Sequence, residues 1–322
     1  MSDTIMKVSH LTKRFRVGRG KYLTAVDDVS FTLRRGETLG IVGESGCGKT
    51  TLGRTLMGIY EPTDGTVELD GTPLHYKDKK EMQRRADRMQ MIFQDPYASL
   101  NPRMTVSEII SEGWNYRRMF TREKRKEKML ELLRIVGLNE EHANRFPHEF
   151  SGGQRQRIGI ARALSMNPEI MICDEPISAL DVSIQAQVMN LLINLQRAKD
   201  LSYIFIAHDL SMVRYISNNI LVMYLGTQVE FGPSAEIYRH GAHPYTEALF
   251  SAIALPDPEN GRLKNRIILS GEIPSPINLP KGCKFCTRCR YATAECGEKR
   301  PELKEIAPGH FCACHHPLTQ NP

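Results

Sequence analysis

The sequence lacks any apolar run long enough to cross a membrane, and its start does not resemble a leader. The longest apolar runs, such as Ile220 to Leu225, stop far short of the about 20 residues that a spanning helix needs. Residues Met1 to His10 contain no charged segment followed by an apolar block, which is the pattern of a secretory signal. We therefore expect a protein that resides in the cytosol.

A strong net charge is also missing. The formal charge is +6 over 322 residues, and the densest basic stretch, Arg117 to Lys128, is of the kind that most often forms a solvated helix face. The charge alone gives no reason to expect nucleic acid or an anionic membrane as a partner, although it leaves both open. The length is enough to bury a core, as one large domain with an appendage or as two domains.

Cysteine is not scarce, but it is unevenly spread. Of the eight cysteines, two lie in the first two thirds of the chain and six crowd into residues 283–314. In a cytosolic protein such crowding favours metal binding over disulfides.

The first half of the chain combines short strands with a helical region. Three segments alternate apolar and polar residues between turn residues and predict a small antiparallel sheet: Met6 to Leu11, Asp28 to Leu33 and Thr66 to Leu69. Helical periodicity with many charges then runs from Thr105 to Val136, and a further helix from Gln154 to Ser165. We expect a helical subdomain at about residues 97–165.

The next part of the chain alternates strands with helices. Apolar strands are predicted at Ile170 to Cys173, Tyr203 to Ala207 and Ile220 to Tyr224, with helical stretches between them. This alternation predicts an α/β fold with a parallel sheet. Beyond Gly232-Pro233 the composition shifts toward proline and cysteine, so we place a domain boundary there, between residues 1–232 and 233–322.

A glycine-rich loop follows the apolar run Thr38 to Val42 and opens a predicted helix. Its sequence is Gly43-Glu44-Ser45-Gly46-Cys47-Gly48-Lys49-Thr50. Glycines let the backbone curl its N–H groups toward phosphate oxygens, and the helix start adds a favourable dipole. Lys49 would supply a cation for the β- and γ-phosphates and Thr50 a hydroxyl for Mg²⁺. An accidental match would rarely also lie between a strand and a helix, so we predict binding of a nucleoside triphosphate.

Two acidic residues end the apolar strand at Ile170 to Cys173. Asp174 would hold Mg²⁺, and Glu175 would polarise the attacking water as a general base. The alternative is a strand-end turn with two solvated acids, which is common alone but less expected beside a phosphate loop.

The segment Phe150-Ser151-Gly152-Gly153-Gln154 starts an arginine-rich helix. Its N-terminal N–H groups and the Ser151 hydroxyl could grip a second phosphate. Taken alone, Ser-Gly-Gly would more often be an ordinary helix cap.

The order of these motifs along the chain favours phosphate binding over an ordinary helix cap. The phosphate loop, Gln94, the Ser151 to Gln154 segment, the Asp174-Glu175 strand end, Ser178 to Asp181 and His208 follow one another with fitting spacings. In this the chain resembles the ATP-binding-cassette (ABC) ATPase family, over roughly residues 5–232. The resemblance implies a P-loop NTPase core of ABC type, in which two cassettes bind head to tail and share each ATP. Because each motif occurs once, the chain would need a second cassette.

The resemblance also implies roles for individual residues. Glu175 would be the catalytic base, with His208 and Gln94 near the γ-phosphate and Asp181 at the dimer contact. The residues that would bind the nucleotide and its Mg²⁺ within the chain are Gly43, Ser45, Gly46, Gly48, Lys49, Thr50, Thr51, Gln94 and Asp174, of which Thr50, Gln94 and Asp174 would serve the metal. Ser151, Gly153 and Gln154 would serve ATP held mainly by the partner.

Two details of the resemblance have alternative interpretations, and one residue departs from the family pattern. Phe15 is the best candidate for the ring that stacks on adenine, with Tyr22 in reserve, although either could be a core ring. His208 could instead be a capping histidine at a strand end. Family members commonly have Leu where this chain has Phe150, a change that keeps an apolar anchor.

The segment Gln94 to Arg103 is similar to that of cassettes that power peptide importers. Three C-terminal segments, His243 to Leu249, Gly271 to Pro276 and Gly282-Cys283, resemble the C-terminal extension of oligopeptide and dipeptide transporter ATPases. The resemblance implies a motor subunit in which ATP binding closes a cassette dimer and hydrolysis resets it. Its partners would be a second, paralogous ATPase, two permeases and an extracytoplasmic solute-binding protein, with this subunit on the cytoplasmic face of the membrane.

Other functions stay open at this stage. The same motor could serve nickel chelates or other small solutes. A soluble cassette ATPase acting on nucleic acid or ribosomes would usually carry two cassettes or long coiled insertions, and this chain has neither. No nucleic acid is therefore expected, and a purely regulatory module would not need Glu175.

The cysteine cluster offers more than four soft ligands, spaced Cys283-x2-Cys286-x2-Cys289-x6-Cys296 and Cys312-x-Cys314-His315-His316. Four thiolates hold either tetrahedral Zn²⁺ or an iron-sulfur cluster, and spacing does not decide between them. By resemblance the matching set is Cys283, Cys289, Cys296 and Cys314, and some transporter relatives carry a [4Fe-4S] cluster there. Cys286 and Cys312 depart from that set. Zn²⁺ and unmetallated thiols remain the alternatives.

Overall fold

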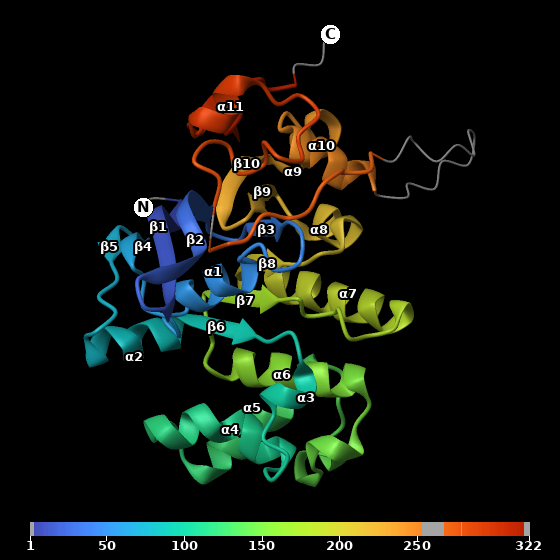
Figure 1. The fold of residues 1–322 in the computed structure, drawn as a ribbon. Helices are drawn as coiled ribbons and strands as arrows, with labels where there is room; N and C mark the ends of the chain where they lie inside the picture. The colour runs from blue at the N-terminus through green and yellow to red at the C-terminus, as the bar shows by residue number, and fades with distance from the viewer. Residues whose placement is uncertain (1–2, 253–266, 278, 319–322) are drawn as a thin grey trace, which may run out of the picture. The chain divides into compact units, whose positions relative to one another are not determined.

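The fold comes from a computed structural model, which describes residues 3–252, 267–277 and 279–318 (Figure 1). The chain forms two compact units. Unit 1 contains the N-terminal residues to Arg34, Thr38–Leu74 and the chain from Ala207 onward. Unit 2 contains Arg35–Glu37 and His75–Ile206. Within the described residues, no helix combines the length and apolar character needed to cross a membrane.

Unit 1 contains the predicted antiparallel sheet. Its strands are β1 (Thr4–Gly18), β2 (Lys21–Arg34), β4 (Asp64–Leu69) and β5 (Thr72–Pro73), in the order β2-β1-β4-β5. The first two strands are much longer than the alternating segments in the sequence. The β1–β2 register shifts between Val8 and Leu11, where His10 has a φ of 52°. The alternation breaks at this irregularity, but the strand pairing resumes beyond it.

The strands of the second sheet that belong to unit 1 come from both ends of the chain. In the order β11-β12-β10-β9-β3, they are β11 (Lys304–Ala307), β12 (His310–Cys312), β10 (Thr227–Pro233), β9 (Asn219–Tyr224) and β3 (Thr38–Val42). β3 and β9 are parallel, and the other pairs are antiparallel. Because β12 pairs with β10, the cysteine-rich segment continues a sheet of this unit, while the domain boundary expected at residue 232 stays a prediction.

Five helices among the described residues accompany the strands of unit 1: α1 (Lys49–Leu56), α8 (Leu210–Ile216), α9 (Ser234–His240), α10 (Pro244–Ser251) and α11 (Ala294–Glu298). The α8 helix begins at an Asp209 cap, whose carboxylate accepts the N–H groups of Ser211 and Met212. The α10 helix begins at His243, whose Nδ1 accepts the N–H of Tyr245 at 3.0 Å.

Unit 2 is built on parallel strands in the order β8-β7-β6. These are β8 (Ser202–Ile206), β7 (Ile170–Asp174) and β6 (Met89–Ile92), with the helices α2 (Lys79–Arg88) and α7 (Val182–Lys199). Every residue of β7 and β8 is buried, which explains their continuous apolar sequences. The parallel strands and intervening helices confirm the predicted α/β class; β6, only four residues long, gave no recognisable pattern in the sequence.

A group of helices completes unit 2. It comprises α3 (Pro96–Ser99), α4 (Val106–Arg117), α5 (Arg122–Ile135), the 3-10 turns Glu140–Asn144 and Pro147–Glu149, and α6 (Gly152–Ser165). Trp114 is 1% exposed and donates its indole N–H to the Ser165 carbonyl at 2.7 Å, which fastens α4 to the end of α6. The helical pattern from Thr105 to Val136 is two helices, because Arg118 takes a left-handed conformation and Thr121 caps a new helix.

Candidate functional site

The glycine-rich loop of unit 1 lies between the buried strand β3 and helix α1, as expected. Gly43 and Gly48 have φ values of +151° and +107°. A Cβ atom at Gly43 would lie 2.2 Å from the Met223 carbonyl oxygen, and one at Gly48 would lie 2.0 Å from the Ala25 carbonyl oxygen. No side chain fits either position, so these glycines fix the path of the loop backbone.

Lys49 is almost fully buried within this loop. Its side chain is 5% exposed, and its Nζ donates to the carbonyl oxygens of Gly43 at 2.7 Å and Glu44 at 3.0 Å. Ser45 and Gly46 are exposed, whereas Thr50 and Thr51 are half-buried at the start of α1. A buried ammonium held by two loop carbonyls is placed to exchange those contacts for phosphate oxygens.

Two residues that the sequence analysis did not select also bind this loop. The Tyr245 hydroxyl accepts the Glu44 N–H at 2.8 Å, and Arg288 pairs with the Glu44 carboxylate at 2.8 Å. Both residues are more than 200 positions away from Glu44, with separations of 201 and 244. No local pattern could have identified them.

The acidic strand end of unit 2 brings three predicted residues together. Asp174 ends β7 and is 1% exposed, while Glu175 follows it half-buried. The Gln94 amide donates to a Glu175 carboxylate oxygen at 2.6 Å. Glu175 has a φ of 45°, and its N–H donates to the Ile206 carbonyl at 2.9 Å. A left-handed backbone at a residue with a side chain costs about 1–3 kcal/mol and is typical of functional sites.

The Ser151 to Gln154 segment forms the start of α6 in unit 2. The Ser151 hydroxyl accepts the Gln154 N–H, and the Gln154 side-chain carbonyl accepts the Ser151 N–H, at 3.3 and 3.1 Å. Ser151 and Gly152 are exposed. Gly153 is buried, and a Cβ there would lie 2.4 Å from Ile184 of α7, so it has a packing role that the sequence did not indicate.

Two neighbouring residues of unit 2 support this geometry. Phe150 is 4% exposed and packs edge to face on the His142 ring, as an apolar anchor should. Asp181 caps α7 and is exposed; hydrogen bonds from the Ser183 hydroxyl and then from the Ile184 N–H lower the pKa of its carboxyl. Asp181 therefore stays ionised.

His208 in unit 1 is exposed just after the chain leaves the second sheet. The N-cap of the following helix α8 is Asp209. The role of His208 at the γ-phosphate and the alternative of a cap at the strand end both stay predictions.

The two candidate adenine rings lie in different surroundings in unit 1. Phe15 packs edge to face on Tyr60 with ring centroids 5.2 Å apart, and the Lys13 ammonium lies 5.0 Å from its centroid. Tyr22 is 53% exposed.

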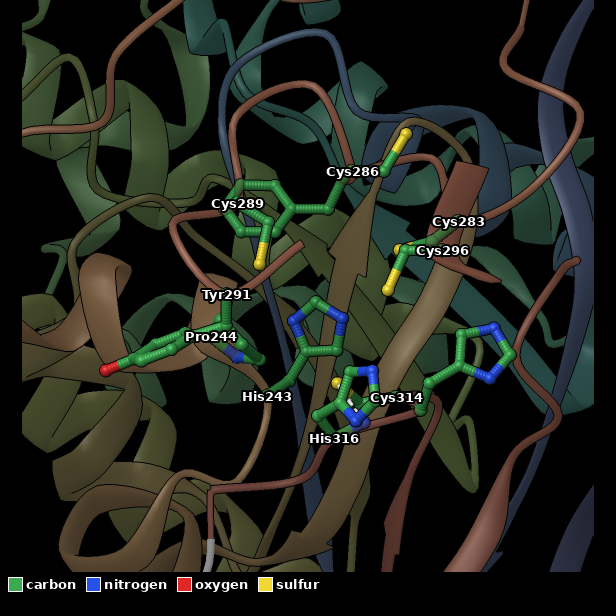
Figure 2. Close-up of a pocket in the computed structure, with 11 residues that line it drawn as sticks. His243, Pro244, Cys283, Cys286, Cys289, Tyr291, Cys296, Cys314 and His316 are labelled. Carbon is green, nitrogen blue, oxygen red and sulfur yellow. Dashed lines mark hydrogen bonds between the residues drawn. The ribbon is translucent and has the colours of Figure 1, made fainter. Parts of the chain in front are cut away.

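The C-terminal part of unit 1 contains a pocket lined by cysteine and histidine (Figure 2). Five of the six clustered cysteines line it: Cys283, Cys286, Cys289, Cys296 and Cys314. Cys312 is 1% exposed in β12 and does not line the pocket. None of the eight cysteines, all of which lie in the described ranges, forms a disulfide.

Burial disfavours the thiolate form of two cysteines of this pocket. Burial raises the pKa of Cys283 to about 12 and that of Cys314 to about 11. In the part of the chain that the structure describes, no three histidine, cysteine or acidic side chains converge closely enough to hold a metal ion. The structure thus gathers all four of the expected cysteines around one pocket, but it does not form a site for a single ion.

Comparison with known proteins accounts for both parts of the chain. Residues 26–178 match the ABC transporter family, and residues 229–296 match the oligopeptide/dipeptide transporter C-terminal region. The oligopeptide transport ATP-binding protein OppF of Bacillus subtilis (strain 168) is 52% identical over 316 residues, which cover 98% of this chain and 97% of that protein. YkfD of the same organism is 57% identical over 312 residues, with 97% and 95% covered.

Solved structures agree with this family. CbiO1 of Clostridium perfringens, part of the ABC transporter complex cbiONQ, aligns with a TM-score of 0.66 and 28% identity over 74% of this chain and 92% of that one. A dimeric structure of the cassette MJ0796 in a post-hydrolysis state, bound to ADP and Pi, aligns with a TM-score of 0.65 and 30% identity over 71% and 99%.

These matches define the class first: the chain belongs to the ATP-binding proteins of ABC transporters, which are ATPases coupled to transport. Within that class it is an ATP-binding subunit of the oligopeptide/dipeptide importer family, and ATP hydrolysis is its motor activity.

Proposed function

We propose that this chain hydrolyses ATP jointly with a second cassette, in a site formed by the phosphate loop of one subunit and the Ser151 to Gln154 helix start of the other. The observation that carries this proposal is the exposed capping box at Ser151, which presents the start of α6 outward. The helix start offers N–H groups and a positive dipole end to an anion. The dimeric state of the similar cassette MJ0796 supports the same arrangement.

The roles of the reacting residues follow from their surroundings in each unit. Glu175 polarises the attacking water, and its hydrogen bond from Gln94 fixes the direction of the carboxylate. Lys49 binds the β- and γ-phosphates, and His208 contacts the γ-phosphate from its exposed position. By the family resemblance Thr50, Gln94 and Asp174 would serve Mg²⁺, and each of these side chains offers the oxygen ligand that a hard cation prefers. When bound, Mg²⁺ neutralises charge on the phosphates.

The adenine ring stacks on Phe15 in this proposal. Its packing against Tyr60 holds the Phe15 ring in one orientation, which lowers the entropy cost of stacking a second ring on it. Tyr22, which is more exposed, is the alternative.

The assembly consists of this subunit, a related ATPase, two membrane permeases and an extracytoplasmic solute-binding protein, with both ATPases on the cytoplasmic face. The solutes are oligopeptides or dipeptides. Near full-length similarity to oligopeptide transport ATP-binding proteins supports this choice over nickel chelates, and no observation favours a role on ribosomes or nucleic acid.

We propose a [4Fe-4S] cluster held by Cys283, Cys289, Cys296 and Cys314, the set that matches transporter relatives, and these four cysteines line one pocket. A zinc ion needs four donors at about 2.3 Å from one point, which requires closely converging thiolates. Thiolates that ligate a cubane lie farther apart, because the cluster itself fills the space between them. The five cysteines line one pocket without converging on a single ion, so the preference for the cluster over zinc rests on the resemblance of these cysteines to those of transporter relatives. Cys286 would be a spare thiol.

Purification under anaerobic conditions tests the cofactor. We expect iron with sulfide near one cluster per chain. If zinc is found instead at one equivalent per chain, the site is a zinc site. Folded protein that contains neither metal would contradict the metal proposal.

Affinity capture from solubilised membranes tests the assembly. We expect recovery of two polytopic permeases and a related ATPase. The shared site is tested separately: hydrolysis at full rate by a rigorously monomeric preparation would contradict it.

A further inference from the structure

Glu44, the second residue of the phosphate loop, is held at two points by the C-terminal part of unit 1. Its backbone N–H donates to the Tyr245 hydroxyl at 2.8 Å. Its two carboxylate oxygens accept hydrogen bonds from the Arg288 guanidinium at 2.8 and 3.2 Å. Both the main chain and the side chain of this loop residue are therefore fixed by residues outside the loop.

Arg288 belongs to the segment Cys283 to Cys289, here called the cysteine loop, and the position of this loop sets the position of Arg288. It lies between Cys286 and Cys289, which both line the cysteine pocket. The Arg288 side chain is 8% exposed and that of Glu44 is 26% exposed, so water screens the pair only in part. A two-point guanidinium–carboxylate contact fixes geometry as well as charge. A movement of the cysteine loop would therefore displace the Glu44 carboxylate or break its contact with Arg288.

Tyr245 connects the loop to the same pocket by another route. It is fully buried, and its ring packs against Tyr224 and Phe285 with centroids 4.7 and 5.4 Å apart. Its N–H donates to His243. Phe285 and His243 both line the cysteine pocket, and Figure 2 shows His243 among its cysteines. Packed side chains therefore run without a break from the pocket to the phosphate loop.

A third contact supports the far end of the loop. Lys284, next to Cys283, donates to the Leu225 carbonyl at 2.8 Å and pairs with Asp27 at 2.9 Å. The following residue, Gly226, donates its N–H to the Cys47 carbonyl at 2.8 Å. The segment that contains Lys284 and Arg288 thus contacts the phosphate loop directly at Glu44 and is linked to Cys47 indirectly, through Leu225 and Gly226.

The charge of Glu44 makes its contact with Arg288 matter for nucleotide binding. A carboxylate on a loop that binds polyphosphate repels its ligand unless a cation neutralises it. Arg288 supplies that cation, and its two-point contact aims the carboxylate along one direction. Removing the guanidinium would leave an uncompensated acid on the loop proposed to bind the phosphates and would remove one restraint on that loop.

We propose that Arg288 and Tyr245 are positioning residues for the phosphate loop, so that the cysteine-containing extension sets the affinity of this subunit for nucleotide. The inference rests on the proposed role of residues 43–50 in binding ATP. It adds that residues far along the chain, none of which touches nucleotide, control that binding through Glu44.

The test measures the Kd for MgATP on the full-length chain, by competition with a bound fluorescent ATP analogue. Arg288→Gln is expected to raise the Kd about tenfold, the size of a unit-charge repulsion at roughly 10 Å in a partly screened site. Arg290→Gln is the matched control. Arg290 lies close to Arg288 in the sequence but pairs with Glu247. The Kd of the Arg290→Gln variant is expected to stay within about twofold of the wild-type value.

A second substitution separates a charge effect from general damage. In Glu44→Gln/Arg288→Gln the repelling carboxylate is gone, so the Kd should recover most of its loss. Tyr245→Phe, which removes only the hydroxyl, should raise the Kd about threefold. Melting temperatures show whether each variant is folded. If Arg288→Gln does not fold, Tyr245→Phe decides alone.

The outcomes are distinct. A wild-type Kd in Arg288→Gln or, where that variant does not fold, in Tyr245→Phe overturns the inference, and so does a double variant as weak as Arg288→Gln. If the wild type binds no nucleotide, or if Lys49→Ala binds it normally, the proposed phosphate site itself fails.

Discussion

The phosphate loop of unit 1 and the acidic strand end of unit 2 are held by different means. The loop is fixed by close backbone contacts that leave no room for a Cβ at Gly43 or Gly48. The strand end is fixed by hydrogen bonds, which hold Glu175 in a left-handed conformation and fasten its carboxylate to Gln94. We therefore expect the proposed phosphate site to depend on the backbone of its loop, and the proposed chemical step to depend on the side chain of Glu175. Substitutions can separate the two.

The largest effect is expected at the strand end. Glu175→Gln removes the general base but keeps the shape of the side chain, so turnover in the assembled complex should fall by about 10²–10⁴-fold while MgATP binding is retained. Steady-state rates and nucleotide titration measure the two quantities. Glu141→Gln, an exposed acid of the helical group, is the control. Normal turnover in Glu175→Gln would remove this residue from the chemical step.

The loop should respond in the opposite way. Gly48→Ala forces a Cβ to within 2.0 Å of the Ala25 carbonyl, and we expect loss of nucleotide binding together with about 1–3 kcal/mol of stability. Thermal or urea unfolding and nucleotide titration measure this. Gly297→Ala in the same unit meets nothing within 4 Å and should be neutral. An equally mild Gly48→Ala would show that the backbone of the loop is less constrained than its contacts indicate.

A smaller effect distinguishes the two neighbours at the start of α8. His208→Ala should lower turnover if His208 contacts the γ-phosphate, and it should cost less stability than Asp209→Ala, because its side chain is exposed and Asp209 is the N-cap of α8. Asp209→Ala should cost about 1 kcal/mol of stability through the lost helix cap. Denaturant unfolding beside ATPase rates separates them; the reverse pattern would assign the structural role to His208.

The smallest effect concerns the opposite end of β7 from Asp174. Hydrogen bonds from Arg88, then from Arg35, lower the pKa of Glu169 below its usual 4.5. The folded state therefore binds this proton less readily than the unfolded state, so the contribution of Glu169 is present above about pH 4.5 and disappears as the pH falls through the lowered value. Because the pair is partly exposed, we expect Glu169→Gln to cost less than about 1 kcal/mol near neutral pH and nothing at acid pH. Unfolding measured across pH checks this, and a loss that persists at acid pH would contradict it.

Much of this molecule could be predicted from short-range patterns. The glycine spacing around Lys49 predicted a strand, loop and helix because steric rules act locally. The continuous apolar sequences of the buried strands, alternating with helical stretches, predicted the parallel sheet of unit 2. Contacts between distant residues could not be predicted. Tyr245 and Arg288 reach Glu44 only because the sheet of unit 1 brings the end of the chain back to its beginning.

The cysteine cluster lies between these two cases. Crowding in the sequence indicated a shared cysteine site, the resemblance selected Cys283, Cys289, Cys296 and Cys314, and all four line one pocket; their role as ligands stays a prediction. The sequence gave no sign that Cys286, which lies outside the helices and strands, would line the pocket too. Nor did it show that Cys312 would be buried outside the pocket, because that depends on how β12 pairs with β10.

The sequence contains a single tryptophan, Trp114, and the structure buries it where α4 meets α6. Intrinsic fluorescence excited at the indole therefore comes from one known place, the helical group that begins with the Gln94 segment and ends with the helix of Ser151. Emission from this residue would follow any rearrangement of those helices during a catalytic cycle, in real time and with no attached dye.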